Sequence, residues 1–258
     1  MAKIKTKEEI VSLRKGGKIL AKILRELAVY AKPGVSTMDI NDYALKLAED
    51  YGAEPVLLGY HPEFAPIPYP AALCTSVNDV VQHGVPDAGE ILEAGDIINL
   101  DMSIGYEGMI VYSGITMPVG GRTDAVSQKL IDVTKEALAL GIKQAKPGNH
   151  IGDISHAIQT YVEAHGFSIV EVLCGHGVGH AVHEEPMVPN FGKAGTGPII
   201  KVGNVFAIEP IVNVGSKEVW FDDDGDGYSV FTSDGSRAAH FEHTVAVTEH
   251  GPEIMTKE

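Results

Sequence analysis

The first thirty residues place apolar side chains at helical spacing between two signals that bound a helix. Thr6 and Glu9 have the three-residue separation of a capping box, which marks a helix start. The run Ala31-Lys32-Pro33-Gly34 marks its end, because proline and glycine interrupt a helix. We therefore predict a long amphipathic helix whose buried face is made by Ile10, Leu13, Ile19, Ile23 and Leu27.

The pattern that follows predicts a second helix and then strands. The helix runs from about Thr37 to Tyr51, and the apolar runs after it are short and rich in residues that favour strands. Tyr106-Glu107-Gly108 separates two of these runs and is predicted to be a hairpin turn. Strands are expected near Ala71–Cys74, Ile97–Ile104 and Met109–Val119.

The same order of elements then begins again. Asp124 to Gln144 is predicted to be a helix, and it ends at a second Ala-Lys-Pro-Gly run. A further helix follows from about Ile151 to His165. Strands are expected near Ile169–Leu173, Val205–Val212 and Thr244–Thr248.

Individual residues repeat along with the elements. A separation of 114 positions relates the two halves, as Ala31, Lys32, Pro33, Gly34, Asp39, Ile40, Glu49 and Gly52 return as Ala145, Lys146, Pro147, Gly148, Asp153, Ile154, Glu163 and Gly166. Such a repeat predicts an α+β fold with two helix-helix-strand halves, about 1–122 and 123–258, around a mostly antiparallel sheet. We expect one domain over 1–258, with a pseudo-twofold axis and a site where the halves meet.

Composition excludes several classes of function. The chain of 258 residues is 44% hydrophobic and 21% charged, which is typical of a globular protein. A net charge of −15 argues against DNA and anionic membranes as partners. The basic helix face at Lys15, Lys18 and Lys22 is expected to be solvated, with transient contact to ribosomal RNA as the alternative. No secretory signal or membrane span is apparent, so a cytoplasmic protein is predicted.

The repeat pairs chemically useful residues. Gly95 to Asp101 resembles Gly203 to Glu209, so each predicted strand ends in a carboxylate. His83-Gly84-Val85 likewise resembles His176-Gly177-Val178, and Glu242 adds a third acid within an apolar strand. Buried carboxylates are costly unless they are paired or bound to a cation.

Each of these residues also has a purely structural interpretation. Asp101 alone is explained as a strand-end cap, Glu242 as half of a salt bridge, and a single histidine as a core side chain. Carboxylates and imidazoles converging from both halves instead favour a divalent metal site, and the two cysteines, Cys74 and Cys174, are too few for structural zinc. Such a site predicts metal-assisted hydrolysis.

The second half contains four motifs in this order: Cys174-Gly175-His176-Gly177-Val178-Gly179, His183-Glu184-Glu185-Pro186, Phe206-Ala207-Ile208-Glu209-Pro210 and Phe241-Glu242-His243-Thr244. They resemble the motifs of the type I methionine aminopeptidases, which have the pita-bread fold. The resemblance covers nearly the whole chain.

The resemblance implies a role for each matching residue. Metal ligands would be Asp101, His176, Glu209 and Glu242, with Glu242 bridging two ions and Glu209 also moving a proton. His83 would contact the substrate, and His183 would donate a hydrogen bond to the scissile carbonyl. The methionine pocket would be lined by Tyr60, Tyr69, Cys74, Val182 and Tyr228, with extra residues at His61–Pro68 on its rim.

One position departs from the family pattern. The family has a fifth ligand, an aspartate that lies eleven residues after the first aspartate and bridges both ions, and that position is Tyr112 here. The internal repeat also favours an acid there, opposite Glu242. A phenol has an unperturbed pKa of about 10 and is poorly suited to bridge two ions. We therefore predict at most about one tightly bound ion, and an impaired or mononuclear enzyme.

The resemblance implies removal of the initiator methionine from nascent chains when the second residue is small. Manganese, iron, cobalt and zinc all suit such ligands. The alternative is a catalytically silent protein that binds peptide N-termini or a protein partner. A third interpretation is an aminopeptidase for other N-terminal residues. A monomer is expected.

Overall fold

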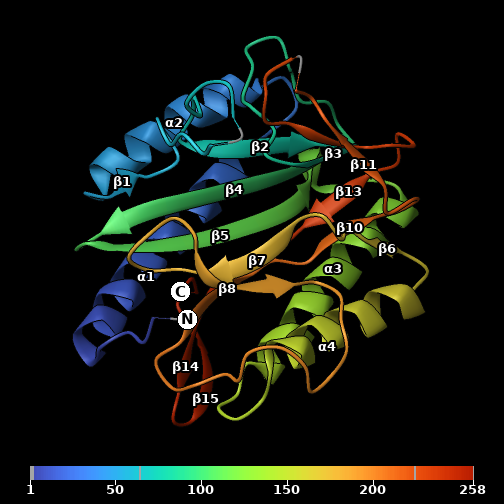
Figure 1. The fold of residues 1–258 in the computed structure, drawn as a ribbon. Coiled ribbons are helices and arrows are strands. Elements are labelled where there is room, and N and C mark those ends of the chain that lie inside the picture. The colour runs from blue at the N-terminus through green and yellow to red at the C-terminus, as the bar shows by residue number, and fades with distance from the viewer. Residues whose placement is uncertain (1–2, 64, 224, 258) are drawn as a thin grey trace.

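Helices flank a strongly curved sheet in the computed structural model, which describes residues 3–63, 65–223 and 225–257. Figure 1 shows one helix pair, in blue, towards the left of the view and the other, in green and yellow, towards the lower right. In the described part of the chain the four α-helices are α1 (Lys7–Tyr30), α2 (Thr37–Asp50), α3 (Ala125–Gln144) and α4 (Ile151–Ala164). None of these described helices is long and apolar enough to cross a membrane.

The first helix forms as its sequence predicts. The Thr6 hydroxyl accepts a hydrogen bond from the Glu9 amide at 3.2 Å, and the Glu9 carboxylate accepts one from the Thr6 amide at 2.7 Å. Leu13, Leu20 and Leu27 are fully buried on the face that packs against β4 and β5. The capping box and the apolar stripe together define where α1 begins and which face it buries.

The main sheet is antiparallel and lies at the centre of the molecule (Figure 1). Within the described residues it has nine strands, with the order β1-β4-β5-β14-β9-β7-β8, while β2 pairs with β4 and β15 with β14. Their bounds are β1 (Glu54–Pro55), β2 (Leu73–Val77), β4 (Ile97–Tyr106), β5 (Met109–Pro118), β7 (Cys174–Gly177), β8 (Glu184–Pro189), β9 (Val205–Ile208), β14 (Glu242–Thr248) and β15 (Gly251–Ile254).

The hairpin between β4 and β5 has the predicted turn. Tyr106 pairs with Met109, so Glu107 and Gly108 form a two-residue connection. Both have positive φ angles, 48° and 77°. Two positive φ angles are what a tight hairpin turn of this handedness needs, and glycine adopts them without strain.

Among the described strands there are also two three-stranded sheets, which lie away from the turn between β4 and β5 (Figure 1). Their described strands follow the orders β13-β10-β6 and β11-β12-β3. The bounds are β3 (Val80–Gln82), β6 (Ser168–Ile169), β10 (Ile211–Asn213), β11 (Val219–Phe221), β12 (Val230–Thr232) and β13 (Ala238–His240).

Three strand predictions need correction. The strand expected over Val205–Val212 is divided between two sheets at Glu209 and Pro210, because proline has no amide to donate to a ladder. The strand expected at Ile169–Leu173 contains only its first residue, since the chain then turns to line a cavity. Asp101 lies in the middle of β4 and does not end it.

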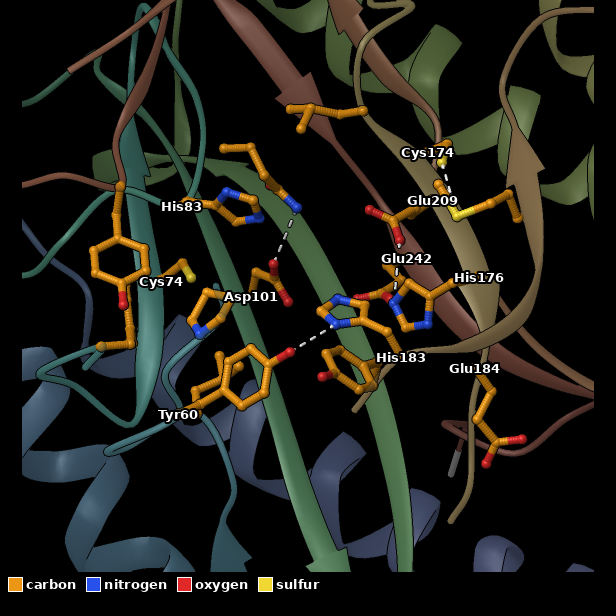
Figure 2. A pocket seen from close by; sticks show the side chains of 18 of the residues that line it. Tyr60, Cys74, His83, Asp101, Cys174, His176, His183, Glu184, Glu209 and Glu242 are labelled. Atoms are coloured by element: carbon orange, nitrogen blue, oxygen red, sulfur yellow. Dashed lines mark hydrogen bonds and ion pairs between the residues drawn. The ribbon is translucent and has the colours of Figure 1, made fainter. Parts of the chain in front are cut away.

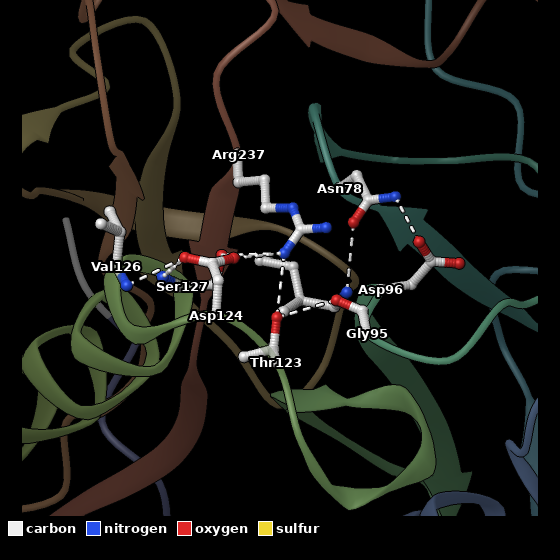
Figure 3. Close-up of polar contacts among 9 residues, drawn as sticks. Asn78, Gly95, Asp96, Thr123, Asp124, Val126, Ser127 and Arg237 are labelled. Atoms are coloured by element: carbon white, nitrogen blue, oxygen red, sulfur yellow. Dashed lines mark hydrogen bonds and ion pairs between the residues drawn. The ribbon is translucent and has the colours of Figure 1, made fainter.

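A cluster of polar contacts joins segments from both parts of the sequence. Figure 3 shows Arg237, just before β13, reaching Thr123, Asp124 and Ser127 at the start of α3, each at 2.9 Å. The Thr123 hydroxyl donates to the carbonyl of Gly95 at 2.8 Å. These contacts fix the start of α3 against the loop before β4.

Candidate metal centre

A cavity of about 530 Å³ opens where the strands of the main sheet meet the loops around β3 and β7 (Figure 2). Of the residues predicted for the site, Val182 is absent from the lining and packs against the α1 core instead. The other predicted residues all line it, and they are Tyr60, Tyr69, Cys74, His83, Asp101, Tyr112, His176, His183, Glu209, Tyr228 and Glu242.

Two of the carboxylates are brought together by strand register. Asp101 on β4 lies opposite Gly114 on β5, and Glu242 on β14 lies opposite the same glycine. Because directly paired residues point to the same face of a sheet, both side chains enter the cavity from one floor. Gln82 donates a hydrogen bond to one Asp101 oxygen at 3.2 Å.

His176 and Glu209 approach this floor from neighbouring segments. The Nδ1 of His176 lies 2.8 Å from the Gly177 carbonyl, so it carries the proton and Nε2 presents its lone pair. That Nε2 is 3.7 Å from Glu209, whose backbone carbonyl accepts a hydrogen bond from Asn190. An imidazole held in one tautomer beside a carboxylate is a common arrangement of metal ligands.

His240 is a member of the site that our sequence analysis missed. Its Nε2 lies 3.8 Å from the second oxygen of Glu209, and its side chain is fully buried. It precedes Glu242 by two positions, and alternate residues of extended chain face the same side. This spacing was the available signal in the sequence. Gln82 and Gly114 gave none, because their roles depend on contacts between strands.

The buried polar atoms fit a divalent cation. Asp101 Oδ1, Glu242 Oε2 and His240 Nε2 are buried and receive no hydrogen bond from a described amide, hydroxyl or backbone donor, and the carboxyl groups of Asp101 and Glu242 lie close enough to share a proton. Unpartnered buried polar atoms are costly, and a bound cation would satisfy them. Over the described ranges two groups have ligand atoms within 4.8 Å of one another, namely His176, Glu209 and Glu242, and Asp101, His240 and Glu242.

Burial shifts the pKa of each carboxyl group upward. It raises the pKa of Asp101 to about 7. Burial, reinforced by the charge of Asp101, raises the pKa values of Glu209 and Glu242 well above 4.5. Three acids so close together resist ionisation unless positive charge is supplied. Cation binding would therefore displace protons from this cluster.

Burial lowers the pKa of the imidazoles. The pKa of His176 is lowered to about 4, that of His83 to about 4, and that of His240 to about 3. Desolvation is the main cause, and a neighbouring histidine adds to it in each case. All three are neutral near pH 7, which is the form that ligates metals.

Tyr112 forms part of the wall beside the ligands. Its ring meets the His176 ring edge-on, with centroids 5.3 Å apart. Burial raises the pKa of its hydroxyl well above 10, and the neighbouring Ser103 hydroxyl only partly offsets this shift. It is therefore a neutral phenol and adds no negative charge to the centre.

His183 lies beside His176 and contacts the side chain of Tyr60. Its ring packs edge-on against His176 at 4.4 Å, and its Nδ1 is 3.3 Å from the hydroxyl of Tyr60 (Figure 2). If Tyr60 donates to Nδ1, Nε2 carries the proton and is a hydrogen-bond donor. Burial lowers the pKa of His183.

An apolar compartment adjoins the carboxylates. Tyr69 and Tyr228 meet edge-on at 4.9 Å and pack with Cys74. The Tyr69 hydroxyl is hydrogen-bonded to the carbonyls of Leu73 and Gly84, and that of Tyr228 to the carbonyl of Ile67. Because these hydroxyls are engaged elsewhere, the ring faces are left for an apolar ligand group. The predicted rim segment, His61–Pro68, is described except for Phe64, which lies outside the described residues.

Comparison with known proteins independently supports a metallopeptidase. The sequence pattern of metallopeptidase family M24 matches residues 11–249. A methionine aminopeptidase of Aquifex aeolicus is 44% identical over 256 residues, covering 98% of this chain and 97% of that protein. The methionine aminopeptidase of Escherichia coli K12 is 40% identical over 259 residues, covering 98% and 93%.

Solved structures agree with the sequence relatives. A methionine aminopeptidase from Thermotoga maritima superposes with a TM-score of 0.94 at 40% identity, covering 100% of both chains. A prolidase from Pyrococcus horikoshii has a TM-score of 0.77 at 20% identity, covering 98% of this chain and 63% of that one, which is a likeness of fold. The chain therefore belongs to metallopeptidase family M24, among the methionine aminopeptidases with the pita-bread fold.

Proposed function

We propose that this protein is an aminopeptidase that removes the initiator methionine from nascent chains whose second residue is small. The observation that carries the proposal is a cluster of buried carboxylates and imidazoles open to an apolar compartment. A thioether side chain suits aromatic walls such as Tyr69 and Tyr228. The relatives named methionine aminopeptidase support the same substrate.

Each polar residue has a proposed role. His176, Glu209 and Glu242 would hold one divalent ion, which acidifies water and polarises a carbonyl when bound. Glu209 accepts the proton of the attacking water and delivers it to the departing amine. His183 donates from Nε2 to the scissile carbonyl oxygen as negative charge develops there, and Tyr60 holds the required tautomer. His83 contacts the substrate near the scissile bond.

Tyr112 is proposed to lower activity without abolishing it. A neutral phenol contributes no charge to balance the cation, so ion binding at this centre is weaker than an aspartate would make it. The three ligands His176, Glu209 and Glu242 nevertheless match the number that catalytic mononuclear sites use. The proposed enzyme is therefore impaired but active.

The setting of the reaction follows from the substrate. We propose that the protein acts in the cytoplasm, where nascent chains are made, with no more than transient contact to the ribosome, and that it is a monomer. The basic face considered for that contact is partly neutralised, because Lys15 is paired with Glu107 at 2.8 Å. This pairing favours the interpretation of a solvated helix face.

A peptide panel tests the proposal. Peptides that begin with methionine, leucine or proline, followed by alanine, are incubated with protein loaded with manganese, iron, cobalt or zinc, and the freed amino acid is measured by mass spectrometry. Release of methionine only from the methionyl peptide is expected. Release of other residues would favour a broader aminopeptidase, and binding without any release would favour the silent protein.

A further inference from the structure

Two residues that line the cavity, Asp101 and Glu242, form a second group of ligand atoms with the fully buried His240, and this group shares Glu242 with the first. Asp101, His240 and Glu242 each offer an atom, and these atoms lie within 4.8 Å of one another. We propose that these three residues form a second cation site, in which His240 takes the place of the carboxylate that Tyr112 does not supply. This inference goes beyond the proposed function, which uses one ion held by His176, Glu209 and Glu242. It is also tested separately, because cation binding can be measured without peptide hydrolysis.

The hydrogen bonds of Asn99 determine which nitrogen of His240 faces the centre. The Asn99 amide nitrogen donates to the His240 backbone carbonyl at 2.9 Å, which identifies its Oδ1 as the acceptor. That Oδ1 lies 3.2 Å from His240 Nδ1, so Nδ1 carries the proton. Nε2 then has a free lone pair and no partner among the described residues. This arrangement prepares an imidazole to bind a cation.

Gly114 makes the space that this imidazole occupies. A Cβ atom at position 114 would lie 2.7 Å from Cε1 of His240 and 2.9 Å from Nδ1. Any larger residue would therefore push the ring away from the carboxylates. Gly114 is also the residue opposite both Asp101 and Glu242, so the three strands converge where the ring is accommodated.

Asp101 and Glu242 also each have a carboxylate oxygen that is free to bind a cation. Gln82 occupies Asp101 Oδ2, while Asp101 Oδ1 and Glu242 Oε2 receive no hydrogen bond from a described amide, hydroxyl or backbone donor. Two carboxylates and one imidazole suit manganese, iron, cobalt or zinc. The sequence predicts at most about one tight ion because a phenol at position 112 is poorly suited to bridge two ions, and that prediction does not consider His240. Counting His240 raises the expected number to two.

The test compares two histidines on either side of Glu242. His240→Asn keeps an amide that can donate to Asn99 and removes the ligand atom. His243→Asn is the matched control, because His243 faces the other side of β14, with Nδ1 2.9 Å from the Thr256 hydroxyl. Each protein is dialysed against manganese(II), and bound metal per chain is measured by elemental analysis and titration calorimetry. Circular dichroism confirms that each variant is folded.

We expect two ions in the wild type and the His243→Asn control, and one in His240→Asn, with the second ion bound at least about tenfold more weakly. One ion in the wild type, or two equally tight ions in His240→Asn, overturns the inference. A second measurement needs no variant: zinc titration should shift the Nε2 nitrogen resonances of both His176 and His240, and an unmoved His240 resonance contradicts the site. Two ions without peptide hydrolysis would support this inference and overturn the proposed function.

Discussion

At the scale of single residues, the centre depends on buried carboxylates and imidazoles. The pKa of Asp101 is raised and that of His176 is lowered, and burial is the main cause of both shifts. Burial therefore leaves the acids in need of positive charge and the imidazoles with free lone pairs. Both effects favour a divalent cation, and neither requires a positively charged side chain in the cavity.

Loss of His83 or His183, the two histidines that we propose contact the substrate, should separate catalysis from metal binding. His183→Ala is expected to lower kcat about a hundredfold, because it removes a donor to the developing negative charge. His83→Ala should also lower turnover. Metal per chain should stay unchanged in both variants, as measured by elemental analysis beside steady-state kinetics. A loss of bound metal would show that either residue is a ligand.

Replacing the phenol tests the role of Tyr112. Tyr112→Asp should tighten ion binding and raise activity, because it adds a negative charge beside the ligands. If His240 serves in place of that acid, then adding His240→Asn should cost less in the Tyr112→Asp background than in the wild type. Calorimetry on the four proteins of this cycle measures the difference. Equal costs in the two backgrounds would show that the residues do not substitute for each other.

Motifs and the internal repeat predicted which residues gather at this cavity, while their roles as ligands stay a prediction. Asp101, His176, Glu209 and Glu242 were predicted as ligands from motifs and the repeat, and each lies in the cavity. His240 was missed because it belongs to no family motif. Its spacing of two positions from Glu242 is the one signal in the sequence. The contacts with Asn99, which fixes its tautomer, and Gly114, which gives it space, join strands far apart in the sequence.

At the scale of secondary structure, boundaries follow local signals and pairing partners do not. The Thr6 capping box and the Glu107–Gly108 turn were predicted and lie where expected. Pro210 divides a predicted strand because its missing amide ends the ladder, which a count of apolar residues overlooks. Short strands such as β3 and β12 were not predicted, since they are stabilised by their partners and have no pattern of their own.

The start of α3 offers a test of one capping residue. Asp124 accepts hydrogen bonds from the amides of Val126 and Ser127 and contacts Arg237 (Figure 3). Asp124→Ala should lower the free energy of unfolding by about 1 kcal/mol, as loss of an N-cap does. Chemical denaturation at pH 7 measures it, with Asp132→Ala, on the exposed face of α3, as the control.

The same substitution carries a pH dependence. Hydrogen bonds from Ser127 lower the pKa of Asp124 from 3.8 to about 2. A lowered pKa in the folded state stabilises the protein above pH 3.8, and this contribution is lost as the pH falls towards 2. The difference between wild type and Asp124→Ala should therefore shrink across that interval. A difference that stays constant would show that the carboxylate charge is not involved.

At the scale of the whole molecule, the site lies between the parts of the chain that the repeat relates. Asp101 comes from the first part, whereas His176, Glu209 and Glu242 come from the second. We propose that 1–258 fold as one domain around this seam. A single calorimetric transition on heating is expected, shifted upward by manganese because the cation binds only the folded chain. Two separate transitions would indicate independently folding halves.

The most direct test of the account is methionine release by metal-loaded protein, with and without Glu209. We expect wild-type protein reconstituted with manganese, iron, cobalt or zinc to free methionine from a Met-Ala peptide. Glu209→Gln should remain folded and reduce release at least about a thousandfold. The substitution removes the negative charge of a proposed metal ligand and the proton acceptor together. Release by Glu209→Gln within a few-fold of wild type would contradict a metal-dependent hydrolysis at this centre.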